Sequence, residues 1–162
     1  MSHADNEQLI TRFYEAFKAR DHAVMAAAYT DDATFSDAVF TGLDAWRIGA
    51  MWRMLCELGT DLEVTFSDVS ASQTEGSAAW QATYTFSATG RRVHNIIQAR
   101  FTFRDGKIAS HVDSFSLWRW MRMALGPIGG TMLGWLPPVQ YAVRSKAAKG
   151  LARYIEKQGI GP

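Results

Sequence analysis

The strongest constraint on the fold is a run of alternating apolar and polar residues that extends from Leu62 to Phe115. A period of two is typical of strands buried on one face. Breaks at Glu75-Gly76 and Asp105-Gly106 divide the run and favour turns between consecutive strands. The pattern predicts four antiparallel strands that include residues 62–66, 80–86, 92–104 and 107–115.

Helical periodicity precedes this run. We expect helices at 6–19, 22–29 and 43–58, with a strand at 33–40 between the second and third. Asp5 is a suitable N-cap for the first helix, and Gly59 a suitable end for the third. Consecutive antiparallel strands that curve over helices make an α+β cone, with a mostly antiparallel sheet wrapped by the three N-terminal helices.

The composition fits one soluble domain of 162 residues. With 17 basic and 16 acidic side chains the net charge is +1, which argues against a nucleic-acid binder. Small molecules or protein partners are the expected ligands. The first residues lack a basic and an apolar region, so no signal peptide and a cytoplasmic location are expected. Cys56 has apolar neighbours and is interpreted as a packed thiol.

Two predicted strands end with a carboxylate, Asp37 on 33–40 and Asp113 on 107–115. An unpaired charge is costly to bury, so each side chain needs a partner or a function. Brought to one cavity, the two would make a plausible acid–base site. His111 and Asp113 are two residues apart and therefore share a strand face. A neighbouring carboxylate would hold the tautomer of His111 or raise its pKa, which would make His111 a usable proton donor. A purely structural polar pair is the alternative.

The order of these features resembles the nuclear transport factor 2-like superfamily, SnoaL-like branch. The resemblance rests on two helices before Asp31-Asp32-Ala33-Thr34, a third helix after Gly42, and Phe101 to Ile108 before the last strand. It covers about residues 5 to 118. It implies a curved sheet wrapped into a cone with an apolar pocket, often as a dimer. Known members include ketosteroid isomerase, polyketide cyclases, limonene-epoxide hydrolase and non-enzymatic binding domains.

The resemblance also implies candidate roles. Asp37 takes the place of the ketosteroid isomerase base, whereas Phe13, with Tyr14 beside it, falls where that enzyme has its oxyanion tyrosine. Asp113 resembles the last aspartate of limonene-epoxide hydrolase and, with His111, the base of the cyclases. The other hydrolase residues would fall near Trp80 and Ala82, so no complete signature is present.

The catalytic candidates are therefore Asp37, His111 and Asp113. Aromatic and polar side chains expected in a substrate pocket are equally suited to the core. Those assigned to substrate binding are Tyr14, Trp52, Trp80, Tyr84, His94 and Gln98. No cofactor is expected, and the four histidines show no spacing typical of a metal site.

Residues 119–162 form a tail that the cone does not need, and we expect it to pack on the cone domain of residues 1–118. A short helix at 117–125 precedes two irregular stretches around Gly126–Gly130 and Leu133–Pro138, and a basic helix follows at 139–157. Three interpretations remain open: a lid over the cone, a dimer contact, or binding to an anionic membrane surface, the least favoured of the three.

The resemblance implies a homodimer, and the sequence predicts a protein that acts on a small hydrophobic molecule, with neither nucleic acid nor a transmembrane span. An isomerase, cyclase or hydratase that uses aspartate acid–base chemistry is the first hypothesis. A non-catalytic module for hydrophobic-ligand binding or dimerisation is the alternative.

Overall fold

A computed structural model describes residues 3–127 and 134–162. The helices are α1 (His3–Lys18), α2 (His22–Ala27), α3 (Ala45–Leu58), α4 (Leu117–Gly126) and α5 (Pro137–Gln158). The strands are β1 (Tyr29–Ser36), β2 (Leu43–Asp44), β3 (Glu63–Ala71), β4 (Glu75–Phe86), β5 (Arg91–Arg104) and β6 (Lys107–Ser114).

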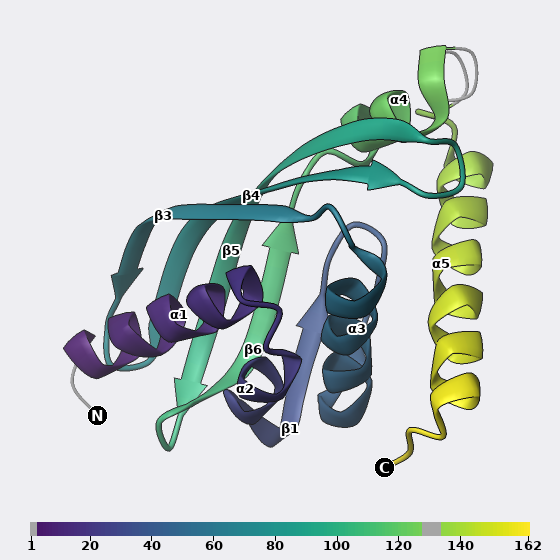
Figure 1. Cartoon of the computed structure of the whole chain (residues 1–162). Helices are drawn as coiled ribbons and strands as arrows, with labels where there is room; N and C mark the ends of the chain where they lie inside the picture. Colours follow the sequence, from purple (N-terminus) through teal and green to yellow (C-terminus); the bar gives the residue numbers. More distant parts are fainter. Residues whose placement is uncertain (1–2, 128–133) are drawn as a thin grey trace.

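The strands form one curved sheet in the order β2-β1-β6-β5-β4-β3. All neighbours are antiparallel except β1 and β6, which run parallel. Helices α1, α2 and α3 lie on one side of the sheet (Figure 1), with α1 against β3 and α3 against β1. The predicted α+β architecture, including the four consecutive antiparallel strands, is confirmed.

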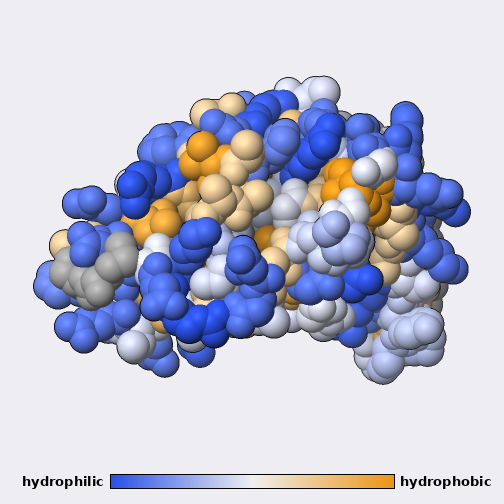
Figure 2. Space-filling view, turned by 90° about the horizontal axis from the view of Figure 1, so that it is seen from below, coloured by the Kyte–Doolittle hydropathy of each residue, from blue (hydrophilic) through white to orange (hydrophobic). Residues whose placement is uncertain are grey.

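The core fills the space between the helices and the concave side of the sheet. Its largest fully buried side chains come from α1 to α4 and the strands, and include Phe13, Tyr14, Phe17, Met25, Phe35, Met51, Trp52, Ile97 and Met121. Aromatic rings pack edge to face, as Phe17 does on Trp52 and on Trp80. The molecule seen from below is mostly hydrophilic, with hydrophobic residues in separate small patches (Figure 2). The apolar side chains are thus turned mainly inward.

Several element ends follow directly from local chemistry. Asp21 and Asp44 cap α2 and α3, because their side chains accept hydrogen bonds from Val24 N and Arg47 N at 3.1 and 3.3 Å. The turn between β5 and β6 has φ of 51° at Asp105 and 77° at Gly106. Two consecutive positive φ angles are the geometry that an Asp-Gly pair favours, so the predicted hairpin turn is confirmed.

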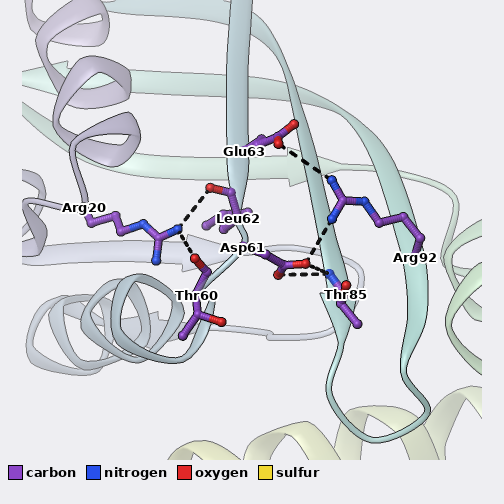
Figure 3. A network of polar contacts seen from close by, with 7 residues as sticks. All are labelled: Arg20, Thr60, Asp61, Leu62, Glu63, Thr85 and Arg92. Carbon is purple, nitrogen blue, oxygen red and sulfur yellow. Dashed lines mark hydrogen bonds and ion pairs between the residues drawn. The ribbon is translucent and has the colours of Figure 1, made fainter.

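Hydrogen bonds and an ion pair hold the connection between α3 and β3 on two sides (Figure 3). Arg20, after α1, donates to the carbonyl oxygens of Thr60 and Leu62 at 2.7 and 3.4 Å. On the other side, the Asp61 carboxylate accepts from Thr85 N at 3.0 Å and pairs with Arg92 at 3.0 Å. This connection therefore links the helical layer to the β4–β5 hairpin.

The observed boundaries correct the sequence prediction in the first third of the chain. α1 begins at His3, so Asp5 lies in its first turn and is not the N-cap. β1 covers Tyr29–Ser36 instead of 33–40, because Tyr29 already pairs with Ile108 of β6. A register irregularity follows Tyr29, and Asp31 and Asp32 lie on this strand exposed to solvent.

The tail folds against the cone domain. α4 lies across the far end of β4 and β5 (Figure 1), where Trp120 Nε1 donates to Tyr84 Oη at 2.7 Å and Thr89 Oγ1 donates to Ala124 O at 2.5 Å. α5 packs against α3 through buried Leu151 and Tyr154. Both predicted tail helices are present, whereas part of the expected glycine-rich break, including Gly129, Gly130 and Leu133, lies outside the described residues.

Within the described ranges, no helix is long and apolar enough to cross a membrane.

Candidate functional site

The parallel pairing of β1 with β6 brings the predicted carboxylates together. Phe35 lies opposite His111, and Ser36 lies opposite Val112. Asp37, immediately after β1, is therefore placed next to Asp113. Because side chains alternate along a strand, His111 and Asp113 both face the interior, with exposed fractions of 0% and 4%. The prediction that these two share a buried face agrees with the geometry.

A chain of hydrogen bonds runs through this buried region. Trp52 Nε1 donates to Tyr29 Oη at 3.1 Å, and Tyr29 Oη lies 2.7 Å from His111 Nδ1. His111 Nε2 lies 3.0 Å from Asp113 Oδ1. Trp80 Nε1 donates to the same Asp113 oxygen at 3.2 Å. The chain thus connects α3, β1, β4 and β6 across the core.

The hydrogen bonds of this chain are all satisfied in one proton arrangement with a neutral imidazole. The indole of Trp52 can only donate, so the Tyr29 oxygen accepts from it. When the His111 proton is on Nε2, the Tyr29 hydroxyl donates to Nδ1 and Nε2 donates to Asp113. Asp113 Oδ1 accepts two hydrogen bonds, the role of a carboxylate, and no hydrogen bond among the described residues engages Oδ2.

Aromatic rings surround His111 on several sides. The ring of Phe101 lies 4.4 Å away, and those of Phe35 and Phe13 stand edge to face at 5.0 and 5.7 Å. Trp52 and Tyr29 stack on the imidazole at about 6 Å. The packing excludes water and holds the imidazole in one orientation.

Asp37 has a different environment from Asp113. Its Oδ1 accepts hydrogen bonds from Val39 N at 2.6 Å and Phe40 N at 2.5 Å, which fixes the turn after β1. Burial, with a smaller contribution from the negative charge of Asp113, raises the pKa of Asp37 to about 6 against the lowering effect of these hydrogen bonds. Asp37 is therefore a turn-forming carboxyl group that titrates close to neutrality.

Tyr14 supplies an unused polar group in the same interior. Its hydroxyl oxygen is fully buried and has no hydrogen-bond partner among residues 3–127 and 134–162. Burial raises the pKa of Tyr14 well above its usual value, with a smaller contribution from the charge of Asp113. The Tyr14 ring lies 5.9 Å from that of Trp80, which holds Asp113. A neutral tyrosine without a partner is a hydrogen-bond donor available to a ligand.

The remaining predicted binding residues divide into two groups. Trp52 and Trp80 are buried members of the hydrogen-bonded chain, and Tyr84 lies at the contact with α4. His94 and Gln98 are not brought to this site. Both alternate with the buried positions of β5, so their side chains are exposed on the opposite face of the sheet, where His94 Nε2 contacts Gln81 at 2.7 Å.

Tyr29 is a site residue that the sequence patterns do not identify. Helical periodicity predicts Tyr29 at the end of the second helix, whereas the residue opens β1 and joins Trp52 to His111. Only the pairing of β1 with β6, a contact between distant parts of the sequence, places it there.

Two open pockets lie at the surface of the described residues, and Asp113 lines neither of them. One, of about 410 Å³, is lined by Thr30, Asp31, Asp32, Arg104, Asp105 and Lys107. The other, of about 370 Å³, is lined by Arg91, Arg92, Arg119, Arg122, Met123 and Pro127. The apolar pocket that the sequence predicts beside the carboxylates is filled here by packed aromatic side chains.

Two further sequence expectations concern reactive groups. Cys56 is buried, and burial raises the pKa of its thiol to about 11, as suits a packed thiol. The part of the chain that the structure describes contains no group of three His, Cys, Asp or Glu side chains arranged to hold a metal ion.

With this geometry established, comparison with known proteins places the chain in a family. The model of the SnoaL-like domain matches residues 10–111. The chain belongs to the SnoaL-like family. The match begins at Ile10, within α1, and ends at His111, within β6. Among curated protein sequences, none matches.

Solved structures with the same fold carry different activities in their names. An LEH-like epoxide hydrolase of M. tuberculosis is 17% identical, with a TM-score of 0.62 over 76% of this SnoaL-like chain and 91% of the other. A proposed SnoaL-like polyketide cyclase from Jannaschia sp. CCS1 is 15% identical, with a TM-score of 0.66 over 75% and 92%. AclR, a proposed hydroxylase from Streptomyces galilaeus, is 20% identical, with a TM-score of 0.63 over 84% and 100%. At these identities the likeness establishes the fold alone.

Proposed function

We propose that this SnoaL-like protein is an enzyme that transfers a proton at a carbon next to a carbonyl group of a small hydrophobic substrate. The observation that carries the proposal is the buried chain Trp52–Tyr29–His111–Asp113. It holds one oxygen of Asp113 in a fixed direction, while the other oxygen has no partner among the described residues. A positioned carboxylate in an apolar interior is a suitable general base.

Each polar side chain has a distinct role in this proposal. Asp113 accepts the proton from the substrate carbon and returns it. Tyr14, whose buried hydroxyl lacks a partner, donates a hydrogen bond to the carbonyl oxygen as negative charge develops there. His111 does not contact the substrate but orients Asp113, and Tyr29 fixes the tautomer of His111. Isomerisation and ring closure both begin with such a proton transfer, so the isomerase and cyclase hypotheses drawn from the sequence share this step.

The hydrophobic character of the substrate follows from the surroundings. The interior around His111 and Asp113 is aromatic on most sides, and Trp80 covers Asp113 directly. A substrate reaches Asp113 only if packed side chains move. The contact between Trp120 and Tyr84 joins α4 to the sheet. Asp37 is close to this contact, because its charge contributes to raising the pKa of Tyr84. We therefore place the entrance under α4, which acts as a lid.

The test is a screen for deuterium uptake. Hydrophobic ketones of increasing size, from monocyclic to fused polycyclic, are incubated in deuterated buffer with the wild-type protein or with Asp113→Asn. We expect the wild type to accelerate deuterium incorporation next to the carbonyl of at least one class, and Asp113→Asn to lose this acceleration. Asp105→Asn, at an exposed turn position that asparagine tolerates, is the matched control. No acceleration by the wild type across the panel would exclude the proposal.

A second candidate function is supported by the filled interior. The cavities found at the surface, and the packing of Trp52 and Trp80 into the core, suit a non-catalytic module for ligand binding or dimerisation. In that case His111 and Asp113 form a satisfied structural pair. Titration of the same ketones by tryptophan fluorescence, with the oligomeric state followed by light scattering, separates the two functions. Binding that Asp113→Asn leaves unchanged, without deuterium uptake, would favour the module.

A further inference from the structure

A second site is suggested by a concentration of arginine at the outer side of α4. Four guanidinium groups, those of Arg91, Arg92, Arg119 and Arg122, line a surface pocket of about 370 Å³ together with Met123 and Pro127. The chain as a whole has a formal charge of only +1, so this clustering is local. Like charges gathered in one concavity repel each other unless counter-charges are close.

Among the four arginines, only Arg92 forms ion pairs with carboxylates of the described residues. Arg92 pairs with Asp61 at 3.0 Å and lies 3.8 Å from Glu63 (Figure 3). Among the described residues, no ion pair reaches Arg91, Arg119 or Arg122. Three positive charges in this pocket therefore lack a protein counter-charge.

The structure holds two of these three arginines in place without using their full hydrogen-bonding capacity. Arg91 Nε donates to Met123 O at 2.8 Å, and no hydrogen bond of the described residues engages its terminal nitrogens. Gly126, at the end of α4, has a φ of 82° and lies against the guanidinium of Arg91. A Cβ added at this position would lie only 3.3 Å from Arg91 Cζ, so the guanidinium is packed closely on the glycine. The guanidinium of Arg122 lies 4.8 Å from the ring centroid of Trp118, which leaves its edge available for hydrogen bonds.

We propose that this pocket binds a phosphoryl group. A phosphoryl group offers three acceptor oxygens and up to two negative charges, which matches three guanidinium groups that lack counter-charges. A carboxylate, with two oxygens and one charge, would leave two of them uncompensated. The group comes either from a soluble phosphorylated molecule or from the headgroup of an anionic lipid. The site is separate from Asp113 and does not depend on the proposed proton transfer.

The test uses the full-length protein and two probes. Binding of inorganic pyrophosphate is measured by calorimetry, and co-sedimentation is measured with phosphatidylcholine vesicles with and without phosphatidic acid. The variant is Arg119→Gln with Arg122→Gln. The matched control is Lys146→Gln with Lys149→Gln, which removes the same charge from exposed positions of α5.

We expect the arginine variant to weaken pyrophosphate or phosphatidic-acid binding about tenfold or more, and the lysine variant to change it little. Binding of pyrophosphate indicates a soluble ligand, and binding of phosphatidic-acid vesicles alone indicates a lipid headgroup. No binding of either probe, or equal loss in both variants, would overturn the site. The Arg119 side chain is exposed and makes no hydrogen bond or ion pair with the described residues, so Arg119→Glu serves as a second variant if the double substitution disturbs α4.

Discussion

The hydroxyl of Tyr29 lies 2.7 Å from Nδ1 of His111, and this contact joins the first residue of β1 to the middle of β6. The same hydroxyl accepts a hydrogen bond from Trp52. It therefore satisfies two buried nitrogens at once. Without it, neither nitrogen has another partner among the described residues, so the orientation of His111, and through it that of Asp113, depends on Tyr29.

Replacing Tyr29 with phenylalanine tests this dependence. The change keeps the ring but leaves Trp52 Nε1 and His111 Nδ1 without partners, and burying an unpaired polar group costs about 1 to 3 kcal/mol. We expect the free energy of unfolding, measured with urea, to fall by about that amount. Tyr141→Phe is the control, since Tyr141 is 73% exposed and should change stability by less than about 0.5 kcal/mol. Equal stability of the two variants would show that the hydrogen-bonded chain contributes nothing.

The raised pKa of Asp37 makes a prediction about pH. Burial moves this pKa from 3.8 to about 6, so between these values the folded state holds a proton that the unfolded state has lost. The stability that Asp37 contributes is fully present below pH 3.8 and is lost as the pH rises through 6. A shift of two units corresponds to at most about 3 kcal/mol.

The measurement is urea unfolding at a series of pH values for the wild type and Asp37→Asn. Asparagine keeps an oxygen to accept from Val39 N and Phe40 N but cannot titrate. We expect the stability of the wild type relative to the variant to decrease between pH 4 and pH 6. A relative stability that rises over this window would mean that the carboxylate is stabilised in the folded state, contrary to the account.

The contact between Trp120 and Tyr84 makes a prediction about the mobility of α4. Trp120→Phe removes the donor to Tyr84 Oη and keeps most of the packing on Phe86. We expect faster hydrogen exchange of the α4 amides, by about five- to tenfold for the loss of about 1 kcal/mol, with β5 and β6 unchanged. Trp118→Phe on the outer side of α4 is the control. If both variants exchange like the wild type, α4 is not held by this contact and the lid proposal loses its basis.

Glycines at two positions should respond to alanine in opposite directions. Gly150 lies within α5, and an added Cβ there meets no atom within 4 Å. Gly150→Ala should therefore stabilise the protein by about 0.5 to 1 kcal/mol. Gly42 also has open space but a φ of 64°, so Gly42→Ala should destabilise it by about 1 kcal/mol. The measurement is the thermal unfolding of both variants and of the wild type. Stabilisation by Gly42→Ala would contradict the positive φ at this turn.

The part of the fold encoded in local patterns could be predicted from the sequence. Alternation along 92–104 assigns Ile97 and Phe101 to the buried face and His94 and Gln98 to the exposed one, as observed. That same alternation argues against His94 and Gln98 as substrate ligands together with His111. Polarity alone makes His94 and Gln98 candidates for a pocket, and the strand period is the stronger argument.

The arrangement of the candidate site depends on contacts that no local pattern encodes. β1 begins at Tyr29 because Tyr29 pairs with Ile108, and this pairing also places Asp37 beside Asp113. Local propensity favoured a turn at Asp31 and Asp32, but the pairing with β6 keeps them in the strand. The filling of the interior by Trp52 and Trp80 likewise depends on packing among several elements.

The most direct test of the central proposal compares the two neighbouring carboxylates on one substrate. For a ketone that the wild type labels with deuterium, kcat/KM is measured for Asp113→Asn and for Asp37→Asn over a range of pH. The account predicts that Asp113→Asn lowers kcat/KM by about a hundredfold or more, as expected for loss of a general base. Asp37→Asn should lower it far less and remove a titration near pH 6. The assignment of Asp113 as the base would be contradicted if Asp113→Asn kept the kcat/KM of the wild type. It would also be contradicted if Asp37→Asn lowered kcat/KM more than Asp113→Asn does.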